Sequence, residues 1–306
     1  MKQTDLLYIG VDGGGTKTAI GAFDLQGRCV AEAICPPLNY HFIGLEAALA
    51  HLQAGIAQLQ IPLDRIAAVG IGDPAIDDVS ECEVAVRFAE RVRSWLGIPV
   101  WIRSDAYMTL YGLTQGKCPG VLIISGTGSM AIAEDAHGRV SVAGGWGRLT
   151  GDEGSGYFIG LQGLRAALHA ADGIAVPTEL TDAALKHFKR ENPRALIEVF
   201  YGEEEPDVAG FAREVAASAE KGDQTATAIL HEAARYLADY VSVLIRRSGA
   251  ELVGVYGSVL CKNPMVRYEF EALLRERYPK ITIMEPPISA QCAAALYAKH
   301  MTERCD

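Results

Sequence analysis

The sequence lacks the cysteine pattern of a disulfide-stapled or zinc-binding protein. Its seven cysteines are scattered along the chain and include no CxxC pair. An odd, scattered set of this kind fits reduced thiols and predicts a cytoplasmic protein. The seven histidines show neither HxH nor HExxH spacing, so neither a structural zinc site nor a zinc hydrolase is expected.

Long apolar runs and an excess of basic residues are absent as well. No stretch is apolar over the length that a bilayer span needs, and the amino-terminal apolar run is too short for a signal peptide, so no membrane association is expected. The 28 basic and 38 acidic residues give a net charge of −10, which argues against a nucleic acid as partner. A small anion such as ATP could still bind through backbone amides and a metal ion.

The chain is long and apolar enough for a large core. Its 306 residues, 49% of them hydrophobic, predict two domains. The most distinctive stretch is residues 120–156. An apolar run at Val121–Ile124 ends in the sequence SGTGS, a second run covers Met130–Ala133, and the chain returns through a turn at residues 137–138. This order predicts strand, glycine turn, strand, turn, strand.

The same pattern occurs roughly 110 residues earlier, which indicates duplicated half-domains. There, Leu6–Val11 runs into the sequence DGGGTK, and strands are predicted at Thr18–Phe23 and Arg28–Ala33 around a turn. Strands then alternate with helices in each half, which predicts a mixed, mostly parallel sheet. Helices are expected at 44–59, 81–96, 106–115, 153–171, 223–247, 264–277 and 288–299, and further strands at 66–71, 100–102, 252–256 and 281–284.

The first glycine turn has the composition of a phosphate site. Its glycines would let phosphate oxygens touch backbone N–H groups, Thr16 adds a hydroxyl donor and Lys17 a positive charge. Asp12, at the strand end, can hold Mg²⁺ directly or through water. The motif is neither a Walker loop nor GxGxxG, and a glycine-rich hairpin turn is the alternative. The candidate ATP contacts in this turn are Gly13, Gly14, Gly15, Thr16 and Lys17.

The second glycine turn strengthens the phosphate interpretation. Its clustered N–H groups can form a nest for an anion, with Gly126, Thr127 and Gly128 as candidate contacts. Two such turns, facing each other across a cleft, could hold one phosphate chain from both sides. A third close-approach loop at Gly257-Ser258 would lie under the adenosine, with an ordinary strand-to-helix turn as the alternative.

Asp105 is the candidate general base. It follows a short strand and precedes a helix, where a carboxylate can take a proton from an alcohol that attacks a γ-phosphate. The alternative is a helix cap, which is the more usual role at that position.

Three further polar or aromatic residues could contact a sugar. Asn39 and Asp152 can make directional hydrogen bonds to hydroxyls, and Trp146 offers an aromatic face. The alternatives are a turn residue for Asn39, a cap of helix 153–171 for Asp152 and a core position for Trp146.

These motifs together resemble a known family. Across nearly its whole length the chain is similar to the N-acetylglucosamine kinases of the BadF/BadG/BcrA/BcrD ATPase-like family, within the sugar kinase/Hsp70/actin superfamily. The matching segments are GVDGGGTK, the Asn39 loop, SDA at 104–106, SGTGS at 125–129, GGWGRLTGDEGSGYFIG at 144–160, VAGFA at 208–212, KGD at 221–223 and YGSV at 256–259. The block at 144–160 is the most specific.

The resemblance implies an α/β fold of two ASKHA (ribonuclease H-like) domains, with mixed five-stranded sheets and flanking helices around a central cleft. The first domain would span 1–118 and be joined by the C-terminal helix at 288–306. The second would span 119–287, with a helical insertion at 177–222. ATP and Mg²⁺ would be the cosubstrate and metal, and the sugar 6-hydroxyl the acceptor.

The resemblance also implies roles for individual residues. Asp105 looks like the catalytic base, Thr16 and Thr127 like phosphate contacts, and Ala209 and Ser258 like contacts on the adenosine side. The implied sugar contacts are Asn39, Asp105, Gly145, Trp146, Gly147 and Asp152.

The expected activity is ATP-dependent phosphorylation of N-acetylglucosamine. Glucosamine is the alternative substrate, and an ATP-hydrolysing switch or activator protein without a sugar substrate is the alternative of another class. The scattered cysteines argue against an activator with a cysteine-ligated iron–sulfur cluster. The loop at 72–78, GDPAIDD, departs from the small Gly/Ala/Ser-rich turn of relatives, and its role is left open. Whether the chain forms a homodimer is also left open.

Overall fold

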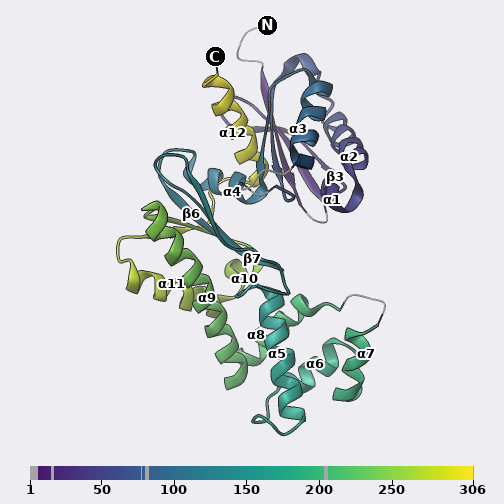
Figure 1. Ribbon diagram of the computed structural model, residues 1–306, viewed down its shortest axis with the longest axis vertical. Helices are drawn as coiled ribbons and strands as arrows, with labels where there is room; N and C mark the ends of the chain where they lie inside the picture. The colour runs from purple at the N-terminus through teal and green to yellow at the C-terminus, as the bar shows by residue number, and fades with distance from the viewer. Residues whose placement is uncertain (1–5, 15–16, 77, 80–82, 203–205, 306) are drawn as a thin grey trace. The chain divides into compact units, whose positions relative to one another are not determined.

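A computed structural model describes residues 6–14, 17–76, 78–79, 83–202 and 206–305. The chain forms two compact units (Figure 1). Unit 1 takes the described residues of Met1–Leu122, Ile132–Ser141 and Glu285–Asp306, and unit 2 takes those of Ile123–Ala131 and Val142–Met284. The predicted division of the chain at 118/119 stays a prediction.

The first five-stranded sheet has the order β3-β2-β1-β4-β5. Its strands are β1 (Leu7–Gly13), β2 (Thr18–Phe23), β3 (Cys29–Cys35), β4 (Ile66–Asp73) and β5 (Val100–Ser104). The first three form an antiparallel meander, and β4 pairs parallel with both β1 and β5. β4 is an almost uninterrupted buried apolar run, as expected for a central parallel strand covered on both faces.

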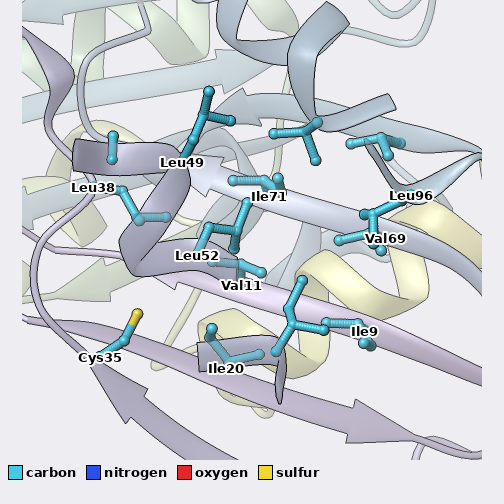
Figure 2. Close-up of a cluster of buried hydrophobic side chains, with 14 of the residues drawn as sticks. Ile9, Val11, Ile20, Cys35, Leu38, Leu49, Leu52, Val69, Ile71 and Leu96 are labelled. Carbon is cyan, nitrogen blue, oxygen red and sulfur yellow. The ribbon is translucent and has the colours of Figure 1, made fainter. Parts of the chain in front are cut away.

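Helices cover both faces of this sheet (Figure 1). On one face, α2 (Leu45–Gln58) and α3 (Glu83–Leu96) build the main core with the strands, which Figure 2 shows in close-up. The short α1 (Tyr40–Ile43) precedes α2, and α4 (Asp105–Thr114) follows β5. On the other face, α12 (Ala290–Glu303) packs through Cys292, Ala295 and Ala298.

Two strand glycines let α12 lie directly on the sheet. A Cβ at Gly70 would overlap the backbone carbonyl of Ala294, and one at Gly10 would overlap the carbonyl of Gln291. Glycine is therefore required at both positions by close backbone approach, and the C-terminal helix completes the core of unit 1.

The second five-stranded sheet has the order β10-β9-β6-β7-β8. Its strands are β6 (Gly120–Ser125), β7 (Ser129–Glu134), β8 (Val140–Gly144), β9 (Leu252–Tyr256) and β10 (Thr282–Met284). β10 runs parallel to β9. The order repeats that of the first sheet, since a three-stranded meander is extended on its first strand by two later strands.

The helices of unit 2 follow the predicted pattern. α9 (Gln224–Ser248) buries the apolar stripe that the sequence predicts, and α11 (Pro264–Arg277) packs against it. α5 (Gly156–Ala171) packs on α8 (Val208–Glu220). The remaining helices are the short α10 (Ser258–Lys262), α6 (Leu180–His187) and α7 (Leu196–Phe200), with the last two in the segment predicted as a helical insertion.

The predicted mixed five-stranded sheets with flanking helices are confirmed. The starts of α2, α4, α5, α9 and α12 differ from the predicted starts. Nearest the site, α4 begins at Asp105 rather than 106, and α5 begins at Gly156 rather than 153. Both starts are fixed by a serine N-cap, Ser104 and Ser155, whose side chain accepts a backbone N–H in the first turn. Among the described helices, none combines the length and apolar character that a bilayer span requires.

Candidate active site

Three aspartates lie at the carboxyl ends of neighbouring strands in unit 1. Asp12, Asp73 and Asp105 follow the apolar residues of β1, β4 and β5, and we call them the carboxylate edge. Asp12 pairs with Gly72 in the β1–β4 register, and Asp73 pairs with Ser104 in the β4–β5 register. The sheet therefore places side by side three carboxylates that are far apart in sequence.

Asp105 is free for chemistry because another residue caps its helix. Ser104 occupies the N-cap of α4, and its Oγ accepts the N–H of Tyr107 at 2.8 Å. The capping interpretation of Asp105 is therefore wrong, and its carboxylate accepts only the neighbouring N–H of Ala106, at 2.8 Å, in the hydrogen bonds described. Burial, reinforced by the charges of Asp12, Asp73 and Asp78, raises the pKa of Asp105 to about 6.

Asp73 is one of the site residues that sequence reasoning missed. It is almost fully buried, and burial raises its pKa to about 6, although its Oδ1 accepts the N–H of Ala75 at 2.9 Å. A signal was present: the segments YIGVD, VGIGD and WIRSD each place an aspartate at or next to the carboxyl end of a strand. Two of the three were assigned a role, and the repetition points to the third.

Asp12 was predicted as the metal ligand. Burial raises its pKa, and the positive charge of Lys17 opposes the shift. The described residues hold no cluster of three or more His, Cys, Asp or Glu side chains suited to a metal. Mg²⁺ needs only one or two carboxylates when phosphate oxygens and waters complete its shell, and a cation would relieve the repulsion along the carboxylate edge, so these residues fit Mg²⁺.

The first glycine turn is only partly described. Gly13 ends β1, and Gly14 donates its N–H to the carbonyl of Lys17 at 3.0 Å, which closes the turn. Gly15 and Thr16 lie outside the described residues, so their predicted phosphate contacts stay predictions.

Asn39 lies next to the carboxylate edge. It caps α1, and its Oδ1 accepts the N–H of His41 at 3.2 Å. The two residues that follow it, Tyr40 and His41, lie near Asp73, and both oppose the rise of its pKa that burial causes. The Asn39 loop and the candidate base therefore belong to one end of the same sheet.

In unit 2 the second glycine turn, residues 125–129, joins β6 to β7 at the start of α5. The N–H of Gly126 donates to the carbonyl of Gly128 at 2.9 Å. Two N–H groups of α5 donate to the turn, that of Gly156 to the carbonyl of Gly126 and that of Tyr157 to the carbonyl of Thr127. The turn thus lies at the positive end of a sixteen-residue helix, which favours an anion.

A cavity of about 440 Å³ opens beside this turn. Four residues predicted as ATP contacts line it together: Gly126, Thr127, Ala209 and Ser258. Sequence reasoning missed the polar side chains on its wall. These include Asp207, Arg213, Lys262 and Asn263. No short motif marks them, because helices distant in sequence bring them to the cavity.

Gly257 allows β9 to end against the second glycine turn. Its φ is +93°, and an added Cβ would overlap the carbonyl oxygen of Ser125. Gly126 differs, because it needs no positive φ and a Cβ there would meet nothing within 4 Å. A side chain at Gly126 would therefore meet no surrounding protein atom, and any clash there would have to come from a ligand.

The loop after β8 holds the other predicted sugar contacts. Gly145 and Gly147 adopt φ values of +73° and +80°, which glycine alone takes without strain. Between them, Trp146 is 78% exposed, so the alternative that it is a core residue is wrong. An exposed indole on a loop that needs glycine on both sides is poorly explained by packing.

Asp152 ties this loop to the second glycine turn. Its φ of +59° is unusual for a residue other than glycine, and its carboxylate accepts the N–H of Ser129 at 3.4 Å and that of Gly147. Burial raises its pKa. Since Ser155 caps α5, the capping interpretation of Asp152 is wrong.

A further pair supports the same loop and was not predicted. The hydroxyl of Tyr240 on α9 donates to the carboxylate of Glu153, and its ring lies 3.0 Å from where a Cβ of Gly144 would be. The tyrosine stacks on the glycine backbone that begins the loop. Only the tertiary structure could reveal this, because 87 residues separate the two side chains.

Comparison with known proteins decides the family. Residues 9–298 match the model of the BadF/BadG/BcrA/BcrD ATPase family. The chain belongs to this family. Its two mixed five-stranded sheets with flanking helices match those of ASKHA sugar kinases, which confirms the predicted fold class.

Two curated relatives match over nearly their whole length. An N-acetyl-D-glucosamine kinase from Dictyostelium discoideum is 30% identical over 318 residues, covering 95% of this chain and 97% of the relative. An N-acetylmuramic acid/N-acetylglucosamine kinase from Clostridium acetobutylicum is 30% identical over 310 residues, covering 97% and 99%. The crystal structure of a candidate N-acetylglucosamine kinase from Chromobacterium violaceum aligns with a TM-score of 0.73 at 27% identity, covering 95% and 99%.

Proposed function

We propose that this family member is an ATP-dependent kinase that transfers the γ-phosphate of ATP to the 6-hydroxyl of N-acetylglucosamine. The observation that carries the proposal is Asp105: a half-buried carboxylate at a strand end, released from capping by Ser104, with a pKa raised to about 6. A base with that pKa is ionised at neutral pH and still basic enough to receive a proton. The names of the curated relatives supply the sugar.

The proposed chemistry needs one proton transfer and one phosphoryl transfer. Asp105 accepts the proton of the 6-hydroxyl as that oxygen attacks the γ-phosphorus, the bond to the β–γ bridging oxygen breaks, and ADP leaves. The negative charges of Asp12 and Asp73 raise the pKa of Asp105 and so make it a stronger base. The proposed sugar contacts are Asn39, Gly145, Trp146, Gly147 and Asp152.

The cavity of unit 2 suits a nucleotide. Its volume of about 440 Å³ is in the range of small-ligand sites, and it opens beside the second glycine turn at the N-terminus of α5, whose dipole favours an anion. We assign the phosphates to Gly126, Thr127 and Gly128. The adenosine side would meet Ala209, Gly257 and Ser258. In unit 1, Gly13, Gly14, Gly15, Thr16 and Lys17 are the proposed phosphate contacts.

The proposed metal is Mg²⁺, held by Asp12. When bound, it would neutralise charge on the transferred phosphoryl group and the leaving ADP. Asp12 suits this role because burial disfavours its charge in the absence of a cation.

A coupled assay of ADP release over a panel of sugars tests the proposal. We expect turnover with N-acetylglucosamine and none above background without sugar, with Asp105→Asn as the inactive control. Faster turnover of glucosamine would make glucosamine the assigned substrate and leave the assignment as a kinase unchanged. Sugar-independent ADP release would favour a switch or activator protein, and no ATP turnover under any condition would overturn the proposal.

A further inference from the structure

Asp78, in the segment after β4, is a buried carboxylate with three donors. Its side chain is 2% exposed. Oδ1 accepts Nε of Arg103 at 2.7 Å and the N–H of Ser104 at 3.3 Å, and Oδ2 accepts the hydroxyl of Ser104. All three donors belong to the two residues that precede Asp105 in the chain.

The hydroxyl of Ser104 has two partners that fix its orientation. A serine hydroxyl has one proton and two lone pairs. Its proton goes to Asp78, so a lone pair is left to accept the N–H of Tyr107 at 2.8 Å, which is the N-cap bond of α4. Asp78 therefore determines how Ser104 caps the helix, and the first turn of that helix carries Asp105.

Arg103 holds the other side of the same turn. Its guanidinium carbon lies 3.9 Å from the ring centroid of Tyr107, while its Nε binds Asp78. Asp78 is thus linked to Tyr107 twice, through the hydroxyl of Ser104 and through the guanidinium of Arg103. The segment from Ser104 to Tyr107, which includes Asp105, is therefore held by contacts at its first and its last residue.

We propose that Asp78 is a positioning residue for the phosphoryl transfer: by holding Ser104 and Arg103, it keeps the carboxylate of Asp105 at the strand ends beside Asp12 and Asp73. This role rests on the proposed function of Asp105 as the base. It also assigns a role to Asp78 in the loop at 72–78, whose role the sequence left open. An ordinary buried ion pair would stabilise the fold without affecting catalysis, so the test must separate these two effects.

Asp24 supplies a matched control. Its Oδ2 accepts Nε of Arg28 at 2.7 Å, and its Oδ1 accepts two backbone N–H groups, so like Asp78 it pairs with an arginine and accepts backbone N–H, but it has no serine hydroxyl as donor. It lies in the turn after Phe23, which pairs with Tyr8 at the end of β1 away from Asp12. Asp24→Asn removes the same charge from the same unit without touching α4.

The experiment compares Asp78→Asn, Asp24→Asn and Asp105→Asn in two measurements. Steady-state kinetics with N-acetylglucosamine and ATP should show kcat of Asp78→Asn lowered about tenfold or more, with KM for ATP within about twofold, because displacement of a catalytic group lowers turnover rather than nucleotide binding. Hydrogen exchange should be faster in the peptide at 104–107 of Asp78→Asn. Asp24→Asn should match the wild type in both.

Two variants of Ser104 make the test more specific. They also provide the test on their own if Asp78→Asn does not fold. Ser104→Thr keeps the hydroxyl and should retain turnover, whereas Ser104→Ala should lose about as much kcat as Asp78→Asn. Equal kcat and equal exchange at 104–107 in wild type and Asp78→Asn would overturn the positioning role. A wild type without sugar-dependent ADP release would instead overturn the proposed function, while the exchange measurement would still decide whether Asp78 holds the helix start.

Discussion

The two sheets have the same strand order, but their strands end in different chemistry. In the first sheet, the carboxyl ends of β1, β4 and β5 carry the half-buried Asp12, the buried Asp73 and the half-buried Asp105. In the second, β6 leads into the second glycine turn and β9 into Gly257. One sheet therefore offers acidic groups for a proton or a cation, and the other offers N–H groups for an anion.

The two meanders also share a turn, and the shared part concerns folding. Asp24 accepts two backbone N–H groups and Nε of Arg28, and Asp135 accepts two backbone N–H groups and Nε of Arg139, both ion pairs at 2.7 Å. In both turns the glycine before the arginine has a positive φ. The repeated residues close hairpins, and the residues that differ between the halves carry the proposed chemistry.

The largest expected effect comes from replacing the proposed base of the first sheet, Asp105. Asp105→Asn keeps the size of the side chain but cannot accept the proton, so kcat should fall by about 10²-fold or more. Calorimetry should show ATP affinity close to wild type, because the nucleotide cavity lies in unit 2. Near-normal turnover would remove Asp105 from the mechanism.

The next effect concerns the second sheet and uses two of its glycines. Gly257→Ala should lower ATP affinity by about tenfold or more, because its φ of +93° and the nearby carbonyl of Ser125 force the turn to move. Gly126→Ala has open space for its Cβ, so any loss of ATP affinity there reports contact with the nucleotide itself. Calorimetric titration of both variants, each checked for folding by circular dichroism, measures this. Equal affinity in wild type and Gly257→Ala would contradict the assignment of the cavity.

The acidity of the first sheet should also appear in the pH dependence. Asp105 must be ionised to act, so kcat/KM should rise with pH through about 6, the value to which burial and the neighbouring carboxylates raise its pKa. Asp73→Asn removes one of those charges and should move the acid limb to lower pH. If the acid limb does not move in Asp73→Asn, the charge of Asp73 does not contribute to the raised pKa of Asp105.

The same substitution should change stability in a pH-dependent way. The pKa of Asp73 is raised to about 6 in the folded protein, from 3.8. Between these values the folded state binds more protons than the unfolded state, so the free energy of unfolding falls as pH rises through this window. At pH values well above 6, Asp73→Asn should therefore raise Tm. Near pH 4 it should change Tm little. A loss of Tm at high pH would show that the hydrogen bonds of Asp73 outweigh its charge.

The smallest expected effect concerns the exposed indole of unit 2. Trp146→Ala should raise KM for the sugar by about two- to tenfold, the range for a contact of ~0.5–1.5 kcal/mol, and leave Tm and KM for ATP unchanged because Trp146 is 78% exposed. Trp146→Phe should retain part of the contact. A clear drop in Tm of Trp146→Ala would indicate a packing role instead.

Sequence patterns predicted most of the elements because the periodicities are strong. The apolar runs of β2 and β9 and the stripe of α9 need no tertiary information, since burial on two faces or on one stripe imposes a regular spacing. The helix starts were less certain. Ser, Asp and Glu all suit a first turn, and the sequence did not distinguish Ser104 from Asp105, or Ser155 from Asp152, as the cap.

The sequence by itself determined the duplicated meanders, the glycine turns and the residue types at strand ends, because these depend on local backbone demands and on a period of two or 3.6 residues. Only the tertiary structure decided which residues act together. Pairing of β1, β4 and β5 brings Asp73 beside Asp105, burial raises the pKa of both, and a contact across 26 residues ties Asp78 to Ser104. Such neighbours arise from strand order and packing, which no local pattern encodes.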